Sequence, residues 1–463
     1  MSSDQHVAMP GPVELFADLY ELRMARAYVE LGMSEQAVFS LFVRRLPAGR
    51  NFLVACGTDV FLEMLERLRF GAESLEYLRS LGEFPPAFID WLAGFRFSGE
   101  VRAVAEGTPI FAEEPIVEVM APIAEAQILE TLVLNQIGLQ TLLASKAARV
   151  VAAAAGRTIV DFGSRRAQGL DAAVMGARAF YIAGVSATSN LLAGARWGIP
   201  VAGTMAHSFI QSFQSEAEAF RAFIRFYPET ILLVDTYDTL SGVAAVVDMA
   251  RELAGDFHVR GVRLDSGDLG GLAQAVRSML DAAGLGHVQI FASGGLDEEK
   301  IAALIGSGAP IDAFGVGTDL SVSGDAPALD LAYKLTRYAG QGRTKLSAGK
   351  RVLPESKQVY RRIADGIAVG DMIALADEPA HEGRMLLRTM MRNGQRLAQS
   401  APLSAIRRHA TTHVAALPER LRALATADPT YPVAVSPALS RRESEVRAAF
   451  RSNALPRKRS PQC

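Results

Sequence analysis

The chain has 463 residues, and its 48 lysines and arginines against 50 aspartates and glutamates give a formal net charge of −2 at pH 7. Such a length allows two or three domains, and a charge so close to zero does not indicate nucleic acid or a membrane surface as a partner. Cys56 lies in an apolar run and Cys463 is the last residue, so neither a disulfide framework nor a cysteine metal site is expected.

The N-terminal part of the chain alternates between helical and β-like patterns. Residues 13–31 show helical periodicity and include Tyr20, which on this pattern alone reads as a half-buried aromatic side chain. Thr58 is suited to cap a later helix, and residues 95–121 are β-like and punctuated by prolines. We therefore predict a small α+β domain over residues 13–122.

Residues 123–338 begin with a long helical region and continue as a repeat of short apolar runs and helix-like segments. The runs recur at roughly 20 to 30 residues, which suits one strand, one helix and two loops. Seven runs predict an irregular, incomplete βα barrel, and a doubly wound open sheet is the alternative. The barrel is favoured because polar residues close nearly every run, whereas an open sheet concentrates its site at one switch point. The runs end at Asp161-Phe162-Gly163, Val185-Ser186, Gly203-Thr204, Val234-Asp235, Leu264-Asp265, Ala292-Ser293 and Val316-Gly317.

The C-terminal part lacks this repeat. Residues 339–435 contain β-like runs with no helices between them, so we expect them to rejoin the N-terminal α+β domain. Residues 436–463 are rich in Arg, Ser and Pro, which predicts a mobile tail. Because residues 1–12 lack a signal-peptide pattern and no apolar run is long enough to span a bilayer, a cytoplasmic enzyme is expected.

Two loops near the end of the predicted barrel are suited to phosphate. Ser293, Gly294 and Gly295 follow one predicted strand and precede a helix, and Gly317 and Thr318 follow the next strand. Glycine lets backbone N–H groups approach an anion closely. In βα barrels a phosphate site often forms at the loops after the last two strands, so we predict one here, with simple tight turns as the alternative.

Carboxylates follow two other runs. Asp235 and Asp238 come after one strand, and Asp265 and Asp268 after the next. They can hold Mg²⁺ bound to phosphates, bind ribose hydroxyls, or cap helices. Asp268 reads as a helix cap. Asp265 follows an apolar run directly and is the candidate catalytic carboxylate and a candidate Mg²⁺ ligand.

An aromatic ring, two cations and a histidine complete the candidate site. Arg165 and Arg166 are natural ligands for a carboxylate or phosphate, and Phe162 can stack on a flat ring. The alternative is a surface salt bridge beside a core phenylalanine. His207 follows Thr204 where an apolar run ends, a position typical of catalytic residues in barrels, although single histidines are more often structural. The combination suits phosphoryl or phosphoribosyl transfer.

Seven motifs occur in order between about Leu15 and about Met391. They are Asp18-Leu19-Tyr20, Phe162-Gly163-Ser164-Arg165-Arg166-Ala167, Gly203-Thr204-Met205-Ala206-His207-Ser208, Asp235-Thr236-Tyr237-Asp238, Arg263-Leu264-Asp265-Ser266-Gly267-Asp268, Gly315-Val316-Gly317-Thr318 and Lys357-Gln358-Val359-Tyr360-Arg361. Together they closely resemble nicotinate phosphoribosyltransferase. The resemblance implies a type II phosphoribosyltransferase fold, with an α+β domain packed on an irregular α/β barrel, working as a homodimer. It also implies that nicotinate and phosphoribosyl pyrophosphate form nicotinate mononucleotide and pyrophosphate, with Mg²⁺ and with ATP hydrolysis coupled through a phosphohistidine.

The resemblance assigns roles to individual positions. His207 corresponds to the phosphorylated histidine and Thr318 to a phosphoribosyl contact. Tyr20, Thr204 and Arg263 correspond to nicotinate contacts, and Tyr20 comes from the partner subunit.

The implied ring site pairs Phe162 with Tyr20 on opposite sides of the pyridine. A nicotinamide or quinolinate phosphoribosyltransferase and a non-catalytic ligand-binding relative are the alternatives, and the paired arginines favour a carboxylate over nicotinamide. Glu355 stands where the family has glycine, so a phosphate-binding role for residues 350–357 stays open. The chain departs from the family pattern also at Ala17, Arg23 and Leu170.

Overall fold

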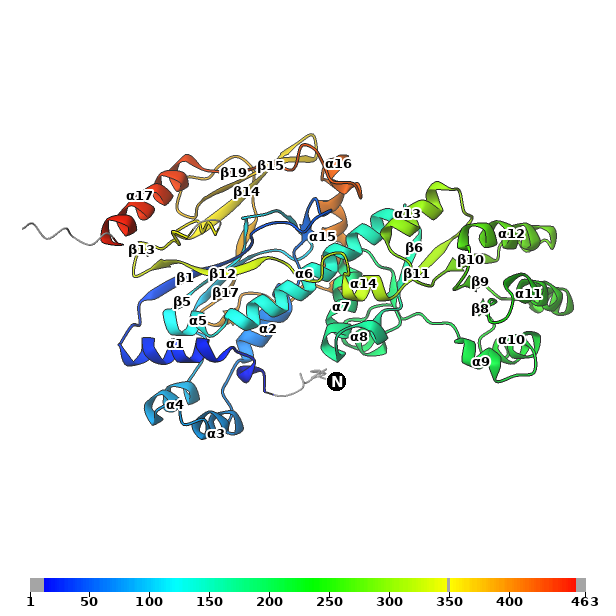
Figure 1. Cartoon of the computed structure of the whole chain (residues 1–463), viewed down its shortest axis with the longest axis horizontal. Coiled ribbons are helices and arrows are strands. Elements are labelled where there is room, and N and C mark those ends of the chain that lie inside the picture. Colours follow the sequence, from blue (N-terminus) through cyan, green and yellow to red (C-terminus); the bar gives the residue numbers. More distant parts are fainter. Residues whose placement is uncertain (1–11, 348–349, 455–463) are drawn as a thin grey trace, which may run out of the picture. The chain divides into compact units, whose positions relative to one another are not determined.

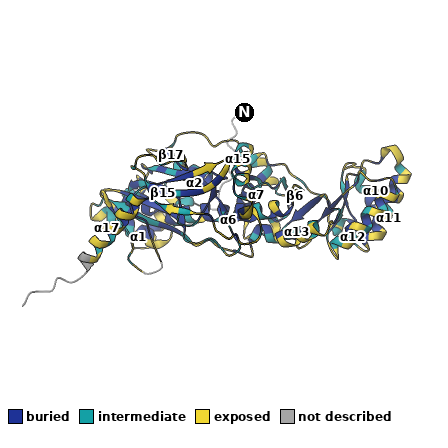
Figure 2. Cartoon of the chain, turned by 90° about the horizontal axis from the view of Figure 1, so that it is seen from above, coloured by how far each residue is buried: buried dark blue, intermediate teal, exposed yellow. Residues whose placement is uncertain are grey.

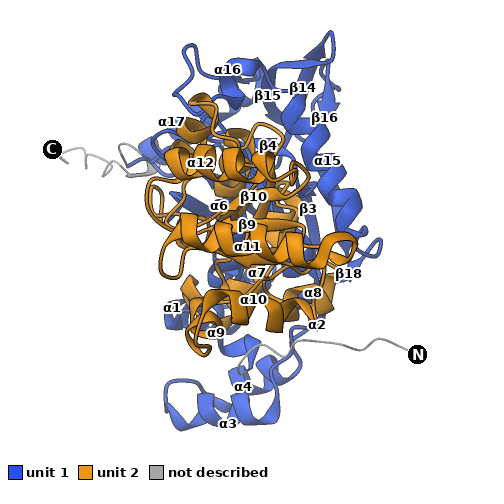
Figure 3. Ribbon diagram, turned by 90° about the vertical axis from the view of Figure 1, so that its right-hand side faces the viewer, with its two compact units in different colours: residues 1–142, 328–463 blue, residues 143–327 orange. Residues whose placement is uncertain are grey.

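The computed structural model describes residues 12–347 and 350–454 (Figure 1). The chain divides into two compact units (Figure 3): unit 1 comprises residues 1–142 and 328–463, and unit 2 comprises residues 143–327. Among the described residues, no helix is long and apolar enough to cross a membrane.

Unit 1 is built on a seven-stranded antiparallel sheet in the order β13-β12-β1-β5-β3-β17-β18. Its interior strand β1 is buried at seven of eight positions. Segments far apart in the chain meet in this sheet, since β1 pairs with β12 and β3 pairs with β17. The strands are β1 (Gln36–Val43), β3 (Glu100–Val104), β5 (Pro115–Pro122), β12 (Leu331–Tyr338), β13 (Gln341–Gly342), β17 (Leu387–Arg392) and β18 (Gln395–Arg396).

The helices of unit 1 pack apolar side chains into the same core, in which Leu22, Phe61 and Ile89 are buried. One expectation for these helices was wrong: Thr58 does not cap α2. The cap position is Gly57, whose φ of 95° suits glycine, and Thr58 is the first helical residue. The helices of its N-terminal part are α1 (Leu19–Glu30), α2 (Thr58–Arg67), α3 (Ala72–Ser80), α4 (Pro86–Ala93) and α5 (Ile123–Gln127), and α15 (Leu403–Ala415) and α16 (Glu419–Arg422) follow later in the chain.

A second sheet of unit 1 has the order β16-β14-β15-β19 and comes entirely from residues 357–435. Its strands are β14 (Lys357–Ala364), β15 (Ile367–Leu375), β16 (Arg384–Met385) and β19 (Val433–Val435).

The prediction of a mobile tail over residues 436–463 was wrong for its first part. Residues Pro437–Ala454 form the helix α17, in which Leu439 is fully buried and Val446 is 6% exposed. Arg442 also donates to Glu355 at 2.7 Å. The helix is held by few apolar side chains and several ion pairs. A segment with such a composition is normally predicted to be solvated, which is why the helix was missed. Residues 455–463 lie outside the described part of the chain.

Unit 2 contains a parallel sheet in the order β7-β6-β11-β10-β9-β8. The last strand in sequence, β11, pairs with the first, β6, as in a closed barrel and unlike the open sheet that was the alternative. A further parallel bridge joins Thr188 to Val201, and among the described residues no ladder connects Val201 to β8. The predicted incomplete βα barrel is therefore confirmed. The strands are β6 (Thr158–Asp161), β7 (Ala187–Thr188), β8 (Ile231–Leu233), β9 (Gly261–Leu264), β10 (Gln289–Ala292) and β11 (Ala313–Val316).

Helices follow the strands of unit 2 and turn their exposed residues outward, while the strands are largely buried (Figure 2). The helices are the end of α6 (Glu130–Ala153), α7 (Leu170–Ile182), α8 (Leu191–Trp197), α9 (His207–Gln211), α10 (Glu216–Ile224), α11 (Thr239–Leu253), α12 (Leu269–Ala282), α13 (Glu298–Gly306) and α14 (Thr318–Val322).

The unit boundaries fall at 142/143 and 327/328, whereas the domain boundaries expected from the sequence were 122/123 and 338/339. The difference has a physical cause. Ile123, Leu132 and Ile137 belong to the core of unit 1, and β12 pairs with β1 in the sheet of unit 1.

Candidate active site

The candidate residues of unit 2 gather where parallel strands end. Phe162 follows β6, Asp265 follows β9 and Ser293 follows β10, and these strands lie in one sheet with parallel pairing. The carboxyl ends of parallel strands share one edge, so the side chains that follow them meet there. Sequence spacing alone predicted this gathering.

Arg263 connects the components of the site. Its guanidinium donates to Asp265 Oδ1 at 3.1 Å, to Ser293 Oγ at 3.2 Å and to the Met205 carbonyl at 2.7 Å. Its Nε atom is buried and has no hydrogen-bond partner among the described residues. Arg263 therefore fixes the loops after β9 and β10 and the segment before α9 around one positive charge.

Phe162 provides a flat apolar surface beside this cation. Its half-buried ring lies 5.8 Å from the ring of Phe291, and the Arg263 guanidinium carbon lies 5.9 Å from its centroid. A Cβ atom at Gly315 would lie 2.6 Å from the Phe162 ring, so glycine is required for the ring to occupy this position. The arrangement can stack an aromatic ligand.

Arg165 and Arg166 lie in the short 3₁₀ turn Ser164–Arg166 after β6, and both are exposed. Burial lowers the pKa of Arg263. The negative charges of Asp265 and Asp235 raise this pKa, and the positive charge of Arg165 lowers it further. Arg165 is thus close enough to act electrostatically on Arg263. The site can present two cations to an anionic ligand.

Asp265 and Asp235 form an acidic pair at the ends of β9 and β8. Asp235 Oδ2 accepts from the Asp265 backbone N–H at 2.9 Å and from Ser266 Oγ at 2.8 Å. Its Oδ1 atom is buried without a hydrogen-bond partner in the described chain. Asp265 Oδ1 accepts from Arg263 and from Ser293 Oγ.

The other two aspartates of these motifs cap helices. Asp238 Oδ1 accepts from the Ser241 backbone N–H at 2.8 Å, at the start of α11. Asp268 Oδ1 accepts from the Gly271 N–H at 3.2 Å, at the start of α12, so the cap expected for Asp268 is confirmed.

His207 is the first residue of α9, and its half-buried side chain faces the acidic pair. Nδ1 lies 3.2 Å from Thr236 Oγ1, and Nε2 lies 3.8 Å from Asp265 Oδ2. The segment around His207 lies where the barrel ladder is interrupted, because no strand follows Val201 before α9. Thr204 donates to the Met205 carbonyl at 3.4 Å and precedes the histidine by three positions.

The predicted phosphate loops follow neighbouring strands, since β10 pairs with β11. Gly294 has φ 93°, and a Cβ atom there would lie 1.7 Å from the Asp265 carbonyl oxygen, so only glycine fits. Gly295 also has a positive φ, of 60°. The loop after β11 begins at Gly317 and continues to the exposed Thr318.

One buried carboxylate of this site was missed from the sequence. Asp161 accepts from the Gly163 N–H at 2.7 Å and from Thr188 Oγ1 at 2.6 Å, and burial raises its pKa. It therefore shapes the turn that carries Phe162. Its position as the last residue of an apolar run was the only signal available.

Tyr20 belongs to unit 1, on α1, and is 45% exposed. Burial raises the pKa of its hydroxyl, and the negative charges of Glu130 and Glu21 add to this effect. With somewhat less than half of its surface exposed, Tyr20 is the half-buried aromatic residue that helical periodicity predicts.

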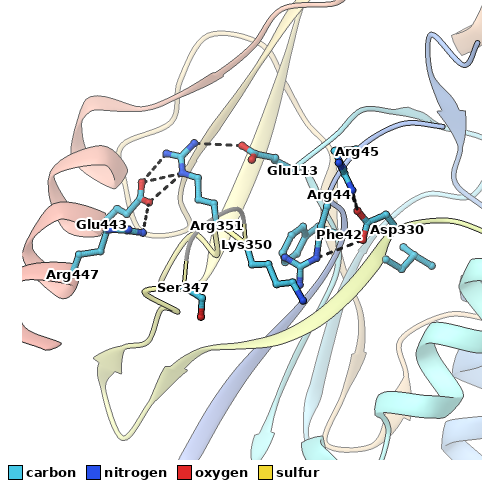
Figure 4. Close-up of a pocket in the computed structure, with 11 residues that line it drawn as sticks. Phe42, Arg44, Arg45, Glu113, Asp330, Ser347, Lys350, Arg351, Glu443 and Arg447 are labelled. Atoms are coloured by element: carbon cyan, nitrogen blue, oxygen red, sulfur yellow. Dashed lines mark hydrogen bonds and ion pairs between the residues drawn. The ribbon is translucent and has the colours of Figure 1, made fainter. Parts of the chain in front are cut away.

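Unit 1 also contains a cavity of about 900 Å³ with a basic lining (Figure 4). Five cations face three carboxylates there, so the lining favours an anion. Arg351 is held by Glu443 at 2.6 Å, and Arg44 lies 3.7 Å from Asp330. The charged side chains are Arg44, Arg45, Lys350, Arg351, Arg447, Glu113, Asp330 and Glu443.

Glu355 stands at the position where the resemblance implies glycine, so it bears on whether residues 350–357 bind phosphate. Its φ is 68°, a conformation that favours glycine. Its carboxylate accepts from Arg442 at 2.7 Å and lies 3.4 Å from Arg337. These ion pairs offset part of the backbone strain of a non-glycine residue at this turn.

No group of three or more His, Cys, Asp and Glu side chains able to hold a metal occurs within residues 12–347 and 350–454. Asp235 and Asp265 are nevertheless two adjacent carboxylates, and one oxygen is unpaired. This donor set fits Mg²⁺, which usually takes one or two carboxylates together with water and substrate phosphates.

Comparisons with known proteins identify the family of the chain. The N-terminal domain model of nicotinate phosphoribosyltransferase (NAPRTase) matches residues 15–138, and the NAPRTase family model matches residues 158–380. The chain is 53% identical over 457 residues to nicotinate phosphoribosyltransferase pncB2 of Mycobacterium tuberculosis, an alignment that covers 98% of this chain and 97% of that protein. It is 41% identical over 384 residues to nicotinate phosphoribosyltransferase of Bacillus subtilis, covering 81% of this chain and 78% of that protein.

A solved structure of human nicotinic acid phosphoribosyltransferase superposes with a TM-score of 0.83 at 28% identity, over 93% of this chain and 99% of that chain. A nicotinate-nucleotide pyrophosphorylase from Pyrococcus furiosus shares the fold, with a TM-score of 0.72 at 24% identity over 89% of this chain and 98% of that chain. The chain therefore belongs to the nicotinate phosphoribosyltransferase family, which its motifs resemble.

Proposed function

We propose that the protein joins nicotinate to the phosphoribosyl group of phosphoribosyl pyrophosphate in unit 2, and that ATP hydrolysis is coupled to this step through phosphorylation of His207. The observation that supports this most is the convergence of Phe162, Arg263 and Asp265 at the carboxyl edge of one parallel sheet. This edge offers a stacking surface, cations and carboxylates within one site.

The pyridine ring of nicotinate stacks on Phe162, and its carboxylate is neutralised by Arg165. Two observations support Arg165 rather than Arg166 in this role: its charge acts on Arg263, and Arg263 in turn lies against the Phe162 ring. Thr204 and Arg263 complete the contacts on this side, and Tyr20 of a second subunit closes the other face.

The ring nitrogen attacks C1′ of ribose, so that a C–N bond forms while the bond from C1′ to the pyrophosphate oxygen breaks. Positive charge develops on the sugar and negative charge on the leaving group. Backbone N–H groups of Gly294 and Gly295 and of the Gly317–Thr318 loop bind phosphate oxygens, whereas the Ser293 N–H already donates to the Leu264 carbonyl at 2.8 Å. The positive φ angles of Gly294 and Gly295 support this role, because they let the backbone approach an anion closely.

Asp265 and Asp235 would hold Mg²⁺ together with substrate phosphates. When bound, the ion supplies positive charge that stabilises the leaving pyrophosphate. The unpaired Oδ1 atom of Asp235 supports this assignment. The basic cavity of unit 1 is a candidate for a further phosphate-bearing group, since its lining carries more cations than carboxylates.

His207 accepts the γ-phosphoryl group of ATP on Nε2. When Nδ1 carries the proton and donates to Thr236 Oγ1, the Nε2 lone pair is available to form the N–P bond as the bond from phosphorus to ADP breaks. Coupling of this kind that multiplies rate or affinity by 10 to 100 corresponds to roughly 1.4–2.7 kcal/mol.

The test is labelling with γ-³²P-ATP of wild type, His207→Asn and His258→Asn. His258 is an exposed histidine of the same unit and serves as the control. Wild type and His258→Asn should carry acid-labile, base-stable phosphate, whereas His207→Asn should carry none and keep a slow ATP-independent transfer. Equal labelling of His207→Asn would place the phosphoryl group on another residue.

A homodimer with shared active sites and a cytoplasmic location stay predictions. The exposure of Tyr20 is compatible with a role in a site completed by a second chain.

A further inference from the structure

A lysine that no motif includes sits behind the two phosphate loops. Lys146 lies on α6, within unit 2, and only 2% of its side chain is exposed. Its Nζ atom lies 2.5 Å from Glu298 Oε2, 2.5 Å from Asp319 Oδ2 and 3.0 Å from Asp325 Oδ1. One ammonium group thus joins three carboxylates.

Two of these carboxylates belong to the helices that the loops enter. Glu298 is the first residue of α13, which follows Ser293-Gly294-Gly295, and Asp319 is the second residue of α14, which follows Gly317. Because β10 and β11 are paired, both loops leave neighbouring strands. Lys146 therefore ties the far ends of the two loops to one point.

Each of the three carboxylates depends on the same ammonium group. Glu298 Oε1 also accepts from Arg149 Nε at 2.8 Å, so α13 keeps a cationic partner without Lys146. Asp319 and Asp325 come from the segment after β11, and both pair with Lys146. Removal of the ammonium would take away the cation that the three carboxylates share, and breaking a buried pair is strongly unfavourable. The spacing between the two loops is then expected to change.

We propose that Lys146 is a positioning residue that fixes the spacing between the Ser293–Gly295 loop and the Gly317–Thr318 loop, and so orders the backbone N–H groups that bind the phosphate of phosphoribosyl pyrophosphate. This inference rests on the proposed phosphate role of those loops. Binding groups need placement within about 0.5 Å for full effect, so a small change in the spacing of the two loops is sufficient to weaken substrate binding.

A purely structural lysine would give a different result. Loss of general stability lowers the amount of active protein and leaves the KM of every substrate unchanged. Loss of loop spacing raises KM for phosphoribosyl pyrophosphate much more than KM for nicotinate, because the ion pairs of Lys146 are with the helices that follow the phosphate loops, whereas the Phe162 ring is held by Phe291 and Arg263.

The experiment compares wild type, Lys146→Met and Arg277→Met. Arg277 is a control in the same unit: it pairs with Asp281 at 2.9 Å and donates to the Val288 carbonyl, before the start of β10 and away from the phosphate loops. Steady-state kinetics are measured with each substrate varied, and binding of phosphoribosyl pyrophosphate alone is measured by calorimetry.

Lys146→Met should raise both the KM and the Kd for phosphoribosyl pyrophosphate about tenfold, which corresponds to about 1.4 kcal/mol. KM for nicotinate should stay within about twofold, and Arg277→Met should match wild type in all three constants. A Lys146→Met enzyme with an unchanged Kd for phosphoribosyl pyrophosphate, or with both KM values raised equally, would overturn the positioning role.

Asp325→Asn removes one ion pair and keeps the lysine, so it is informative if Lys146→Met fails to fold. This variant should raise KM and Kd for phosphoribosyl pyrophosphate, by less than Lys146→Met does. If neither constant changes, the inference is contradicted. Failure of wild type to bind phosphoribosyl pyrophosphate would refute the proposed function itself, and the inference with it. The wild-type measurement thus separates the two failures.

Discussion

At the scale of single residues, Arg165 and Arg166 are adjacent cations for which we propose different roles. Replacing Arg165 by Ala removes the charge that acts on Arg263 beside the Phe162 ring. A bound carboxylate would lose its partner, so nicotinate affinity should fall by roughly 2–5 kcal/mol. KM for nicotinate is the measurement, and phosphoribosyl pyrophosphate affinity should change little.

Arg166→Ala is the matched control, since it changes the same side chain in the same turn. Its KM for nicotinate should stay close to that of wild type. A larger effect at Arg166 than at Arg165 would reverse the assignment.

Glu21 gives unit 1 a pH-dependent stability. It is fully buried, Thr131 donates to its Oε1 atom from the backbone at 2.9 Å, and burial raises its pKa to about 7. The folded state therefore binds a proton that the unfolded state releases between about pH 4.5 and 7, and this contribution to stability is lost as pH rises through that window. The neighbouring acidic groups Glu130 and Asp18 act in the same direction.

Glu21→Gln keeps the shape of the side chain and removes its titration. The melting temperature of the variant relative to wild type should rise between pH 5 and pH 8. Thermal unfolding at both pH values is the measurement, and two curves that run parallel with pH would contradict the prediction.

At the scale of elements, the turn after β10 is constrained by contact as well as by conformation. Gly294→Ala places a Cβ atom 1.7 Å from the Asp265 carbonyl, so the loop must move. Phosphoribosyl pyrophosphate affinity should fall by at least about tenfold, since displaced N–H groups no longer fit the phosphate. Calorimetric titration measures this directly.

Gly308→Ala is the control for backbone strain alone. Its φ is 74°, and a Cβ atom there would meet nothing within 4 Å. This variant should lose about 1 kcal/mol of stability and keep its affinity. Equal loss of affinity in both variants would show that strain, and not contact with the Asp265 loop, is responsible.

The elements of unit 2 could be read from the sequence because each apolar run ended in polar residues. Parallel strands then bring Phe162, Asp265 and Ser293 to one edge without further information. Two elements of the chain were not predicted in this way. The run before Thr204 forms only a bridge at Val201, and α17 depends on ion pairs such as Arg351–Glu443 that no local pattern encodes.

Contacts between distant segments could not be predicted from the sequence either. Lys146 lies in a helix rich in Leu and Ala, and its partners come more than a hundred residues later, so neither periodicity nor spacing marks it. The preference between Arg165 and Arg166 depends on side-chain electrostatics around Arg263 and could not follow from their adjacency.

At the scale of the whole molecule, Tyr20 and His207 belong to different units. If a second subunit supplies Tyr20, a Tyr20→Ala chain and a His207→Ala chain are each defective, and one site of their mixed dimer has both residues. Mixing the two variants should restore part of the ATP-coupled activity. No recovery, after subunit exchange has been demonstrated with tagged chains, would argue against a shared site.

The most direct test of the account is pyrophosphate release from phosphoribosyl pyrophosphate by the wild-type protein, with nicotinate, nicotinamide or quinolinate as acceptor, with and without ATP. The cations beside Phe162 match a single ring carboxylate, and His207 supplies the coupling. Nicotinate should therefore give the highest kcat/KM, and ATP should increase it. A preference for nicotinamide or quinolinate, or a rate with nicotinate that ATP leaves unchanged, would contradict the account.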